Sequence, residues 1–326
     1  MKKSFKLFFS MILVLVLLFT VAGCKNDTPD EPVEPLKVLV PNGSPLIGFG
    51  SILDDTTNYD ITTITGPDLL TSAFVSDDYD VIISGITLGA KLYTLDSTNY
   101  RLSTVFTEGN VFILSRGNET ISDLSVLEGK NVIGFGESST PGIVLKTAIT
   151  EAGGDIEKVN FTWENGVSDA IAVFNSTPTA DYVLSSEPVI ATMQNKVYNT
   201  EDNQLSVFDV CATLEEAIPQ AGIFVNKDCE KSAQVTAFLN KISENITTMN
   251  EDNSAYADSL LALTSTNSAF FGTLGKEVLV QAIPGCNLVY HPAKDQKVAI
   301  NAFITLLNEK NPAFLDGKTV DDDFYY

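Results

Sequence analysis

The sequence predicts an α/β fold organised in two lobes. Short apolar strands alternate with helical stretches from residue 36 to residue 93, and the same alternation begins again at residue 131. This order is typical of parallel sheets whose strands are joined by right-handed crossovers. The folded part, about 290 residues, is larger than one small core usually becomes, which favours two lobes.

The N-terminal segment has the order of a secretory signal peptide. Three lysines among the first six residues precede an apolar run from Leu7 to Val21, and Ala22-Gly23-Cys24 follows. A charged region, an apolar region and a small-residue cleavage site mark such peptides, and the run is shorter than the roughly 20 residues that span a bilayer. The last residues resemble a bacterial lipobox, so we expect residues 1–23 to be a lipoprotein signal peptide and Cys24 to carry the lipid. The alternative is an ordinary cleavage site, which would leave a secreted protein without an anchor.

A proline-rich tether is expected next. Residues 25–35 read KNDTPDEPVEP, and prolines at this spacing are incompatible with a helix or a strand. We therefore expect residues 24–35 to be an acidic, semi-extended tether that holds the folded body off a membrane surface.

The strands and helices of the first lobe are expected to form a β-α-β-α-β unit. Its first strand ends at the turn Pro41-Asn42-Gly43-Ser44-Pro45, and Val81-Ile82-Ile83 is a continuous apolar run typical of a buried strand. We expect strands at residues 36–40, 61–65 and 81–83, a helix that opens at Pro67 and Asp68, and a helix at residues 88–93.

The second lobe repeats this order. Residues 136–141 form a turn into a helix whose first turn suits Pro141. Apolar residues at positions 144, 145, 148, 149 and 152 give this helix one apolar face, and Gly153-Gly154 ends it. Strands are expected at residues 131–135, 159–162 and 182–184, and a further helix at residues 167–174.

The C-terminal part is expected to be mostly helical, with helices at residues 231–248, 256–263 and 293–308. These helices need a sheet to pack against, so we expect the chain to return to the first lobe. The two crossings between lobes are placed near residues 107–114 and 221–226. Lobe 1 then comprises residues 36–110 and 226–326, and lobe 2 comprises residues 111–225.

The net charge argues against nucleic acid as a partner. The chain has 20 Lys and Arg against 42 Asp and Glu, a net charge of −22, and such a field repels nucleic acid and anionic headgroups. Arg101 and Arg116 are the only arginines and are expected at the surface, so the sequence disfavours a strongly anionic ligand. A neutral or aromatic ligand could instead stack on Tyr93, Phe49 or Trp163.

Three cysteines remain beside Cys24, an odd number for an exported protein. A disulfide between Cys211 and Cys229 is an open possibility, because both flank the strand expected at residues 222–225. The sequence has no CxxC pair and a single histidine, His291, so no metal site and no cofactor are expected.

Two stretches of the second lobe resemble a known family. Leu127 to Gly134 reads LEGKNVIG, and Ser138-Ser139-Thr140-Pro141 follows. Together with the lipobox and the two lobes, these motifs resemble the substrate-binding lipoproteins of ABC importers, of the nitrate/sulfonate/taurine or thiamine-pyrimidine-precursor-binding type. Gly136-Glu137 replaces the usual glycine-rich lead-in of that family, and the ending Asp321 to Tyr326 resembles that of one uncharacterised branch.

The resemblance implies a two-lobed periplasmic-binding-protein-like (type II) fold with two crossings between the lobes. It also implies an extracytoplasmic solute-binding lipoprotein, held on the cell membrane by its lipid, that delivers a small molecule to an ABC permease and its ATPase. A monomer is expected. The expected mechanism is hinge closure, in which the ligand contacts both lobes only in the closed form.

Ligands of such proteins are expected where the C-terminal ends of strands meet helix N-termini. Small hydroxyl residues and glycine lie at these positions in both lobes. Helix capping alone is the alternative role for each segment. The candidate ligand-binding residues are Asn42, Gly43, Ser44, Ser84, Gly85, Thr87, Ser138, Ser139, Thr140, Asn165, Ser186 and Glu187.

An enzyme is the weaker interpretation. A thiamine pyrimidine synthase on the same fold sacrifices a histidine and uses clustered cysteines, whereas this chain has only His291 and no cysteine cluster. No nucleophile elbow or P-loop motif is found either. A lipoprotein that senses a ligand without transporting it is the other alternative.

Overall fold

The structure is a computed structural model that describes residues 34–65, 68–117, 121–215 and 217–326. Residues 35–326 form one compact unit. The expected signal peptide, Cys24 and all of the tether before residue 34 lie outside the described residues. No helix of the described part is long and apolar enough to cross a membrane.

A mixed six-stranded sheet, in the order β11-β4-β10-β3-β1-β2, forms the first half of the body. β1 is parallel to β2 and β3, whereas β10 is antiparallel to β3 and β4, and β11 is antiparallel to β4. The strands are β1 (Leu36–Pro41), β2 (Tyr59–Ile64), β3 (Val81–Gly85), β4 (Tyr100–Glu108), β10 (Pro219–Asn226) and β11 (Leu288–Pro292).

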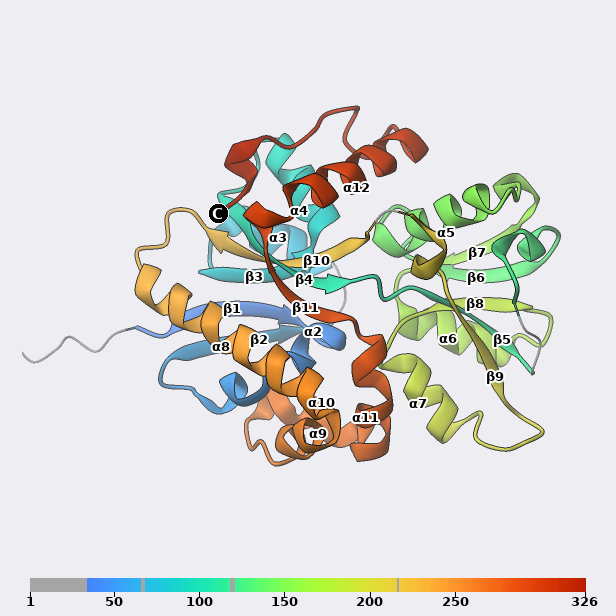
Figure 1. Ribbon diagram of the computed structural model, residues 1–326, viewed down its shortest axis with the longest axis horizontal. Coiled ribbons are helices and arrows are strands. Elements are labelled where there is room, and N and C mark those ends of the chain that lie inside the picture. Colours follow the sequence, from blue (N-terminus) through green and yellow to red (C-terminus); the bar gives the residue numbers. More distant parts are fainter. Residues whose placement is uncertain (1–33, 66–67, 118–120, 216) are drawn as a thin grey trace, which may run out of the picture. The chain divides into compact units, whose positions relative to one another are not determined.

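Helices cover both faces of this sheet because its strands are apolar on both sides. Leu39 and Ile82 pack with α3, α4 and α12, whereas Val38 and Ile83 pack with α8, α9 and α11 (Figure 1). Alternate residues of a strand point to opposite faces, so both cores are built from the same strands. The helices are α2 (Ser44–Ile47), α3 (Asp68–Ser76), α4 (Ile86–Thr94), α8 (Ser232–Glu251), α9 (Asn253–Leu261), α10 (Ala269–Leu274), α11 (Lys276–Gly285) and α12 (Lys297–Lys310).

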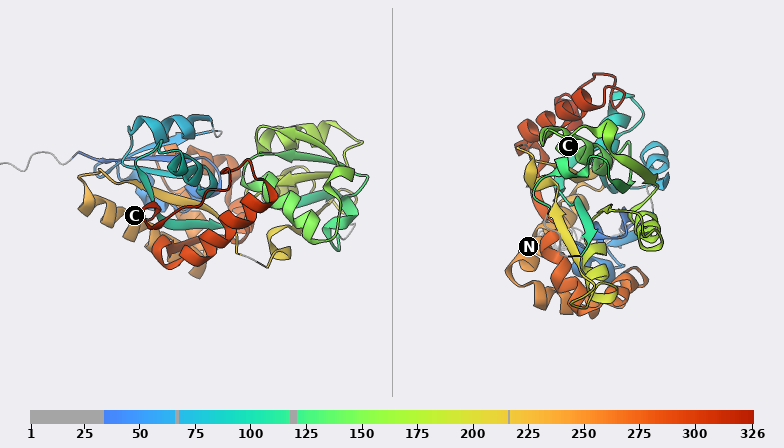
Figure 2. Two further views of the ribbon diagram at one scale, coloured as in Figure 1. Left: turned by 90° about the horizontal axis from the view of Figure 1, so that it is seen from above. Right: turned by 90° about the vertical axis from the view of Figure 1, so that its right-hand side faces the viewer.

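A mixed five-stranded sheet, in the order β7-β6-β8-β5-β9, forms the second half (Figure 2). β6 is parallel to β7 and β8, and β5 is antiparallel to β8 and β9. Helix α5 packs on one face, and α6 and α7 pack on the other. The elements are β5 (Phe112–Arg116), β6 (Asn131–Phe135), α5 (Thr140–Glu151), β7 (Asn160–Glu164), α6 (Val167–Ser176), β8 (Tyr182–Ser185), α7 (Val189–Lys196) and β9 (Leu205–Asp209).

The predicted α/β fold is confirmed, with one correction to the place where the chain changes sheets. It leaves the first sheet between β4 and β5 and returns between β9 and β10. Residues 219–225, which the sequence analysis assigned to lobe 2, pair with β3 and β4 in the first sheet. Ile223, Phe224 and Val225 are fully buried there, which a strand inside a sheet requires and a crossing does not.

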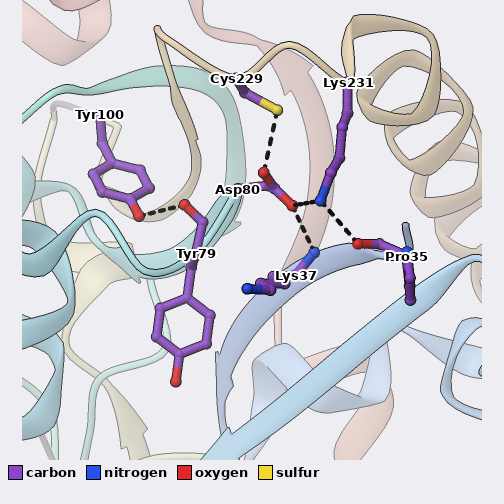
Figure 3. Close-up of polar contacts among 7 residues, drawn as sticks. All are labelled: Pro35, Lys37, Tyr79, Asp80, Tyr100, Cys229 and Lys231. Atoms are coloured by element: carbon purple, nitrogen blue, oxygen red, sulfur yellow. Dashed lines mark hydrogen bonds and ion pairs between the residues drawn. The ribbon is translucent and has the colours of Figure 1, made fainter. Parts of the chain in front are cut away.

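A polar cluster holds the start of the folded body (Figure 3). The Asp80 carboxylate accepts hydrogen bonds from the backbone N of Lys37 at 2.8 Å and from Lys231 Nζ at 2.9 Å, and from the Cys229 thiol at 3.4 Å. Lys231 Nζ also donates to the backbone oxygen of Pro35 at 3.0 Å. This entry cluster therefore joins the first residues of β1 to the start of α8.

The cysteines of the described part are free thiols, so the disulfide considered between Cys211 and Cys229 is not formed. Cys229 lies beside Asp80, whereas Cys211 packs against Gly109, in the crossing between β4 and β5. Each thiol is thus held by a different part of the fold.

Candidate functional site

The twelve candidate residues fall into five segments, which lie at residues 42–44, 84–87, 138–140, 165 and 186–187. Each segment immediately precedes or opens a helix, namely α2, α4, α5, α6 or α7. The N-cap residues are Gly43, Gly85, Ser139, Gly166 and Pro188, and none of these five caps makes a side-chain capping hydrogen bond. The predicted residue Glu187 nevertheless caps α7 from outside the N-cap position, since its Oε2 accepts from the backbone N of Ala191. At α4, α5 and α6 no side chain at the N-cap accepts a hydrogen bond from the first turn, which leaves backbone N–H groups as donors for another group.

Helix N-termini from the two sheets meet at one point. The hydroxyl oxygens of Thr87, in the first turn of α4, and Thr140, at the start of α5, lie 3.0 Å apart. Both side chains are buried, at 5% and 4% exposure. Two positive helix ends therefore face the same point, where they favour a ligand atom that accepts hydrogen bonds or carries negative charge.

A second contact joins the sheets beside the crossing. Ser44 Oγ donates to the backbone oxygen of Glu187 at 2.6 Å. The Asn110 side chain completes this contact: its Nδ2 donates to Ser44 Oγ at 2.8 Å and to Glu187 O at 3.1 Å, and its Oδ1 accepts from Glu187 N at 2.7 Å. Gln220 Oε1 in turn accepts from the backbone N of Asn110 at 2.7 Å.

Asn110 was missed by the sequence analysis. The residue is 4% exposed and lies in the crossing between β4 and β5. The one local signal is a lone asparagine between a glycine and an apolar run, Gly109-Asn110-Val111. Its role depends on segments more than 60 residues away, which no local pattern indicates.

The carboxyl group of Glu187 is buried between helices of the two halves. Its Oε2 accepts from the backbone N of Ala191 in α7 at 3.0 Å, and its side chain lies against Gly285 at the end of α11. Burial raises the pKa of Glu187 to about 7. Burial likewise raises the pKa of the neighbouring Cys286 thiol to about 12, so the thiol stays protonated near neutral pH.

Four other predicted residues are exposed and make no contact between the sheets. Asn42 Nδ2 donates to Thr65 Oγ1, and Ser139 Oγ donates to Gly136 O, while Ser138 and Asn165 are open to solvent. The structure therefore joins only Ser44 with Glu187 and Thr87 with Thr140 from the predicted set.

Buried hydroxyls lie near these contacts. The side-chain oxygens of Ser84 in β3 and Ser185 in β8 are buried and have no hydrogen-bond partner among the described residues. Both come at the C-terminal ends of their strands, next to Gly85 and Ser186 of the predicted site. Such groups normally have partners, because an unpaired buried polar atom costs about 1–3 kcal/mol.

The predicted aromatic and arginine candidates have structural surroundings. Trp163 stacks on Phe161 with ring centroids 4.8 Å apart, and Phe49 is fully buried in the first half. Arg116 lies 3.8 Å above the Phe174 ring and Arg101 lies 4.8 Å above the Tyr93 ring. Both arginines also donate to backbone oxygens, so they are partly buried rather than surface residues.

Two cavities of the described part lie elsewhere. One, of about 580 Å³, is at the crossings and includes Glu108 and Cys211; the other, of about 730 Å³, is a polar hollow that includes Arg101 and Lys227. None of the twelve predicted residues lines either cavity. The hydrogen bonds at Thr87 and Ser44 bring the two halves into direct contact at the predicted site instead. The described residues contain no cluster suited to a metal ion.

Solved structures share this fold along most of the chain. An ABC transporter from Parabacteroides distasonis is 16% identical, with a TM-score of 0.72, over 90% of this chain and 98% of that one. The alkanesulfonate-binding protein SsuA from Xanthomonas axonopodis pv. citri, bound to MOPS, is 12% identical, with a TM-score of 0.66, over 90% and 98%. A more distant neighbour, DSZB in complex with biphenyl-2-sulfinic acid, is an enzyme that is 10% identical, with a TM-score of 0.59, over 90% and 96%.

These likenesses confirm the periplasmic-binding-protein-like fold that the resemblance implied. Two of these three structures come from ABC transporters. No family model matches the sequence, and no curated protein matches it.

Proposed function

We propose that this chain is an extracytoplasmic solute-binding lipoprotein. It captures a small molecule between its two lobes and delivers the molecule to the permease and ATPase of an ABC importer. The lipid on Cys24 holds it, as a monomer, on the extracytoplasmic face of the cell membrane. In this proposal lobe 1 is built on the first sheet and lobe 2 on the second.

The observation that carries the proposal is the meeting of α4 and α5. Their N-termini come from different sheets and approach at the Thr87 and Thr140 hydroxyls, 3.0 Å apart. In this proposal a ligand atom replaces the direct contact between the two hydroxyls and accepts hydrogen bonds from both lobes at once. An open form offers the donors of one lobe only. The ligand would therefore shift the equilibrium toward the closed form by the difference between its binding free energies for the two forms.

The ligand that fits this site best is neutral and rich in hydrogen-bonding atoms. The twelve proposed site residues include no lysine or arginine. The nearest cation on α5, Lys146, pairs with Glu137 at 2.9 Å and lies 4.9 Å above the Trp163 ring. A sulfonate or carboxylate would thus rely on helix N-termini alone, without the bidentate arginine that such groups favour.

The site is proposed to bind and release its ligand without reacting with it. His291 Nε2 faces Glu108 at 3.8 Å, beside the crossing and outside the proposed site. The thiols of Cys211 and Cys286 have pKa values raised to about 12 by burial, which disfavours the thiolate needed for attack.

Native mass spectrometry of the mature chain tests this proposal directly. We expect a co-purified small molecule whose loss follows Thr140→Phe, since a bulky ring at the start of α5 would block the meeting point. Thr150→Val, at the exposed end of the same helix, should retain the molecule and serves as the matched control. A ligand that stays bound to Thr140→Phe would contradict the site, and a chain that binds no small molecule from its growth medium would contradict the function.

Two further measurements test the lipid anchor and the choice between import and sensing. Labelled palmitate should be incorporated into the unaltered chain and not into Cys24→Ala, and an unaltered chain that carries no label would argue against the anchor. Neighbouring genes for a permease and an ATPase would favour import, whereas a neighbouring histidine kinase would favour sensing.

A further inference from the structure

The crossings between the two sheets border an open hollow that the proposed function does not use. Its volume is about 580 Å³, and its walls come from Glu108-Gly109, from residues 209–215 and 217–218 of the second crossing, and from the turn between α11 and β11. We call it the crossing cavity. Small-molecule sites usually measure roughly 300–1,000 Å³, so its size suits a small ligand.

The walls of the crossing cavity are hydrogen-bonded to one another. The backbone N of Glu108 donates to Asn287 O, and that of Gly109 donates to Ile218 O, each at 3.0 Å. Asn287 Nδ2 donates to Gly109 O at 2.6 Å. A Cβ at Gly109 would lie 2.9 Å from Cys211 Cβ, so the two crossings touch each other there. The shape of the cavity therefore depends on both segments that connect the lobes.

The lining combines apolar side chains with carboxylates. Leu214, Pro284 and Val289 are apolar lining residues with exposed surface, whereas Glu108, Asp209 and Glu215 contribute negative charge. None of the described lining residues is a lysine or an arginine. His291 Nε2 lies 3.8 Å from the Glu108 carboxylate, and Asp209 Oδ1 accepts hydrogen bonds from the backbone N of Cys211 and of Ala212. An apolar wall beside three carboxylates is complementary to an organic cation, and the net charge of −22 attracts such ions.

We propose that the crossing cavity binds a small organic cation, an ammonium group carried on an apolar body. The ammonium group pairs with Glu108 and Asp209, and the apolar body packs against Leu214, Pro284 and Val289. Because this ligand touches both crossings, it stabilises one arrangement of the lobes and acts as an effector of their closure. The proposal does not depend on what the inter-lobe site binds.

Two soluble probes of nearly equal shape test the proposal. The mature chain is titrated with cyclohexylmethylamine, which is protonated at neutral pH, and with cyclohexylmethanol, using ligand-detected NMR. We expect the amine to bind about tenfold more tightly, or about 1.4 kcal/mol, because only the amine gains the charge pairing. Glu108→Gln should reduce that difference, because it removes one of the two pairing carboxylates, and Glu277→Gln, an exposed carboxylate of α11, should preserve it.

A blocking variant shows where the probe binds. Ala212 is an exposed lining residue, so Ala212→Trp should fill the mouth of the cavity without disturbing the core and should abolish binding of both probes. Equal affinities of amine and alcohol, or undiminished binding to Ala212→Trp, would overturn the proposal. Absence of saturable amine binding to the unaltered chain would overturn it as well.

Discussion

Replacing Glu187 with glutamine should stabilise the protein above neutral pH and have little effect in acid. The carboxyl group is buried and accepts a hydrogen bond from Ala191 N, and burial raises its pKa from 4.5 to about 7. Glutamine keeps the shape and the acceptor oxygen but cannot ionise. The variant therefore removes only the cost of a buried negative charge.

The magnitude follows from the two pKa values of Glu187. Between pH 4.5 and pH 7 the folded state keeps the proton and the unfolded state releases it, so the free energy of unfolding falls as pH rises through this window. Above the folded-state pKa this loss of stability is complete. At about 1.4 kcal/mol per pH unit the whole window corresponds to about 3 kcal/mol, of which roughly 2–3 kcal/mol falls between pH 5 and pH 8.

Urea denaturation at pH 5, 6, 7 and 8 measures this difference, with Trp163, the sole tryptophan, as the fluorescent probe. We expect the stability gap between Glu187→Gln and the unaltered protein to widen steadily with pH. Glu277→Gln, which replaces an exposed carboxylate on α11, should show the same pH dependence of the free energy of unfolding as the unaltered protein. A gap that stays constant within about 0.5 kcal/mol across this range would refute the buried-carboxyl reasoning.

Three further substitutions test other contacts. Asn110→Ala should lower the free energy of unfolding by about 2–3 kcal/mol in urea, since it leaves a buried backbone N–H without its acceptor, and a loss below about 1 kcal/mol would contradict that role. Gly134→Val should cost at least about 2 kcal/mol and shift the Trp163 emission, because a Cβ at residue 134 would lie 2.3 Å from the indole ring; unchanged emission would show that the ring is not held there. Lys231→Met should cost about 1–2 kcal/mol by unpairing the half-buried Asp80 carboxylate, and hydrogen exchange should accelerate at the start of β1, whereas exchange at the unaltered rate would place the attachment elsewhere.

The parts of the fold that the sequence predicts are those with local signals. β6 begins and ends at the predicted residues, Asn131 and Phe135, because a polar residue and a glycine turn bound its apolar run. Helices α7 and α11 were not predicted. α11 contains a Val-Leu-Val run and an internal Pro284, a pattern that favours neither helix nor strand, and its burial against other helices decides its conformation.

The site shows the same division. Thr87 and Thr140 were predicted from their positions after strands, and the structure joins them. The pairing of Ser44 with Glu187 depends on Asn110 in the crossing, whose side chain is hydrogen-bonded to both residues. A single sequence does not indicate which distant residues an asparagine will contact. The sequence thus indicates which residues follow strands, whereas it does not indicate which of them meet across the two sheets.

The entry cluster decides how the folded body resists a pull on its N-terminus. Force applied at Pro35 acts along β1, which lies between β2 and β3 and runs parallel to both. All the hydrogen bonds of these two pairings then bear the load together in shear, instead of breaking one after another as in peeling. The bond from Lys231 Nζ to Pro35 O diverts part of the load to α8 before it reaches the strand. A body attached in this way should keep its fold intact when force is applied at residue 35.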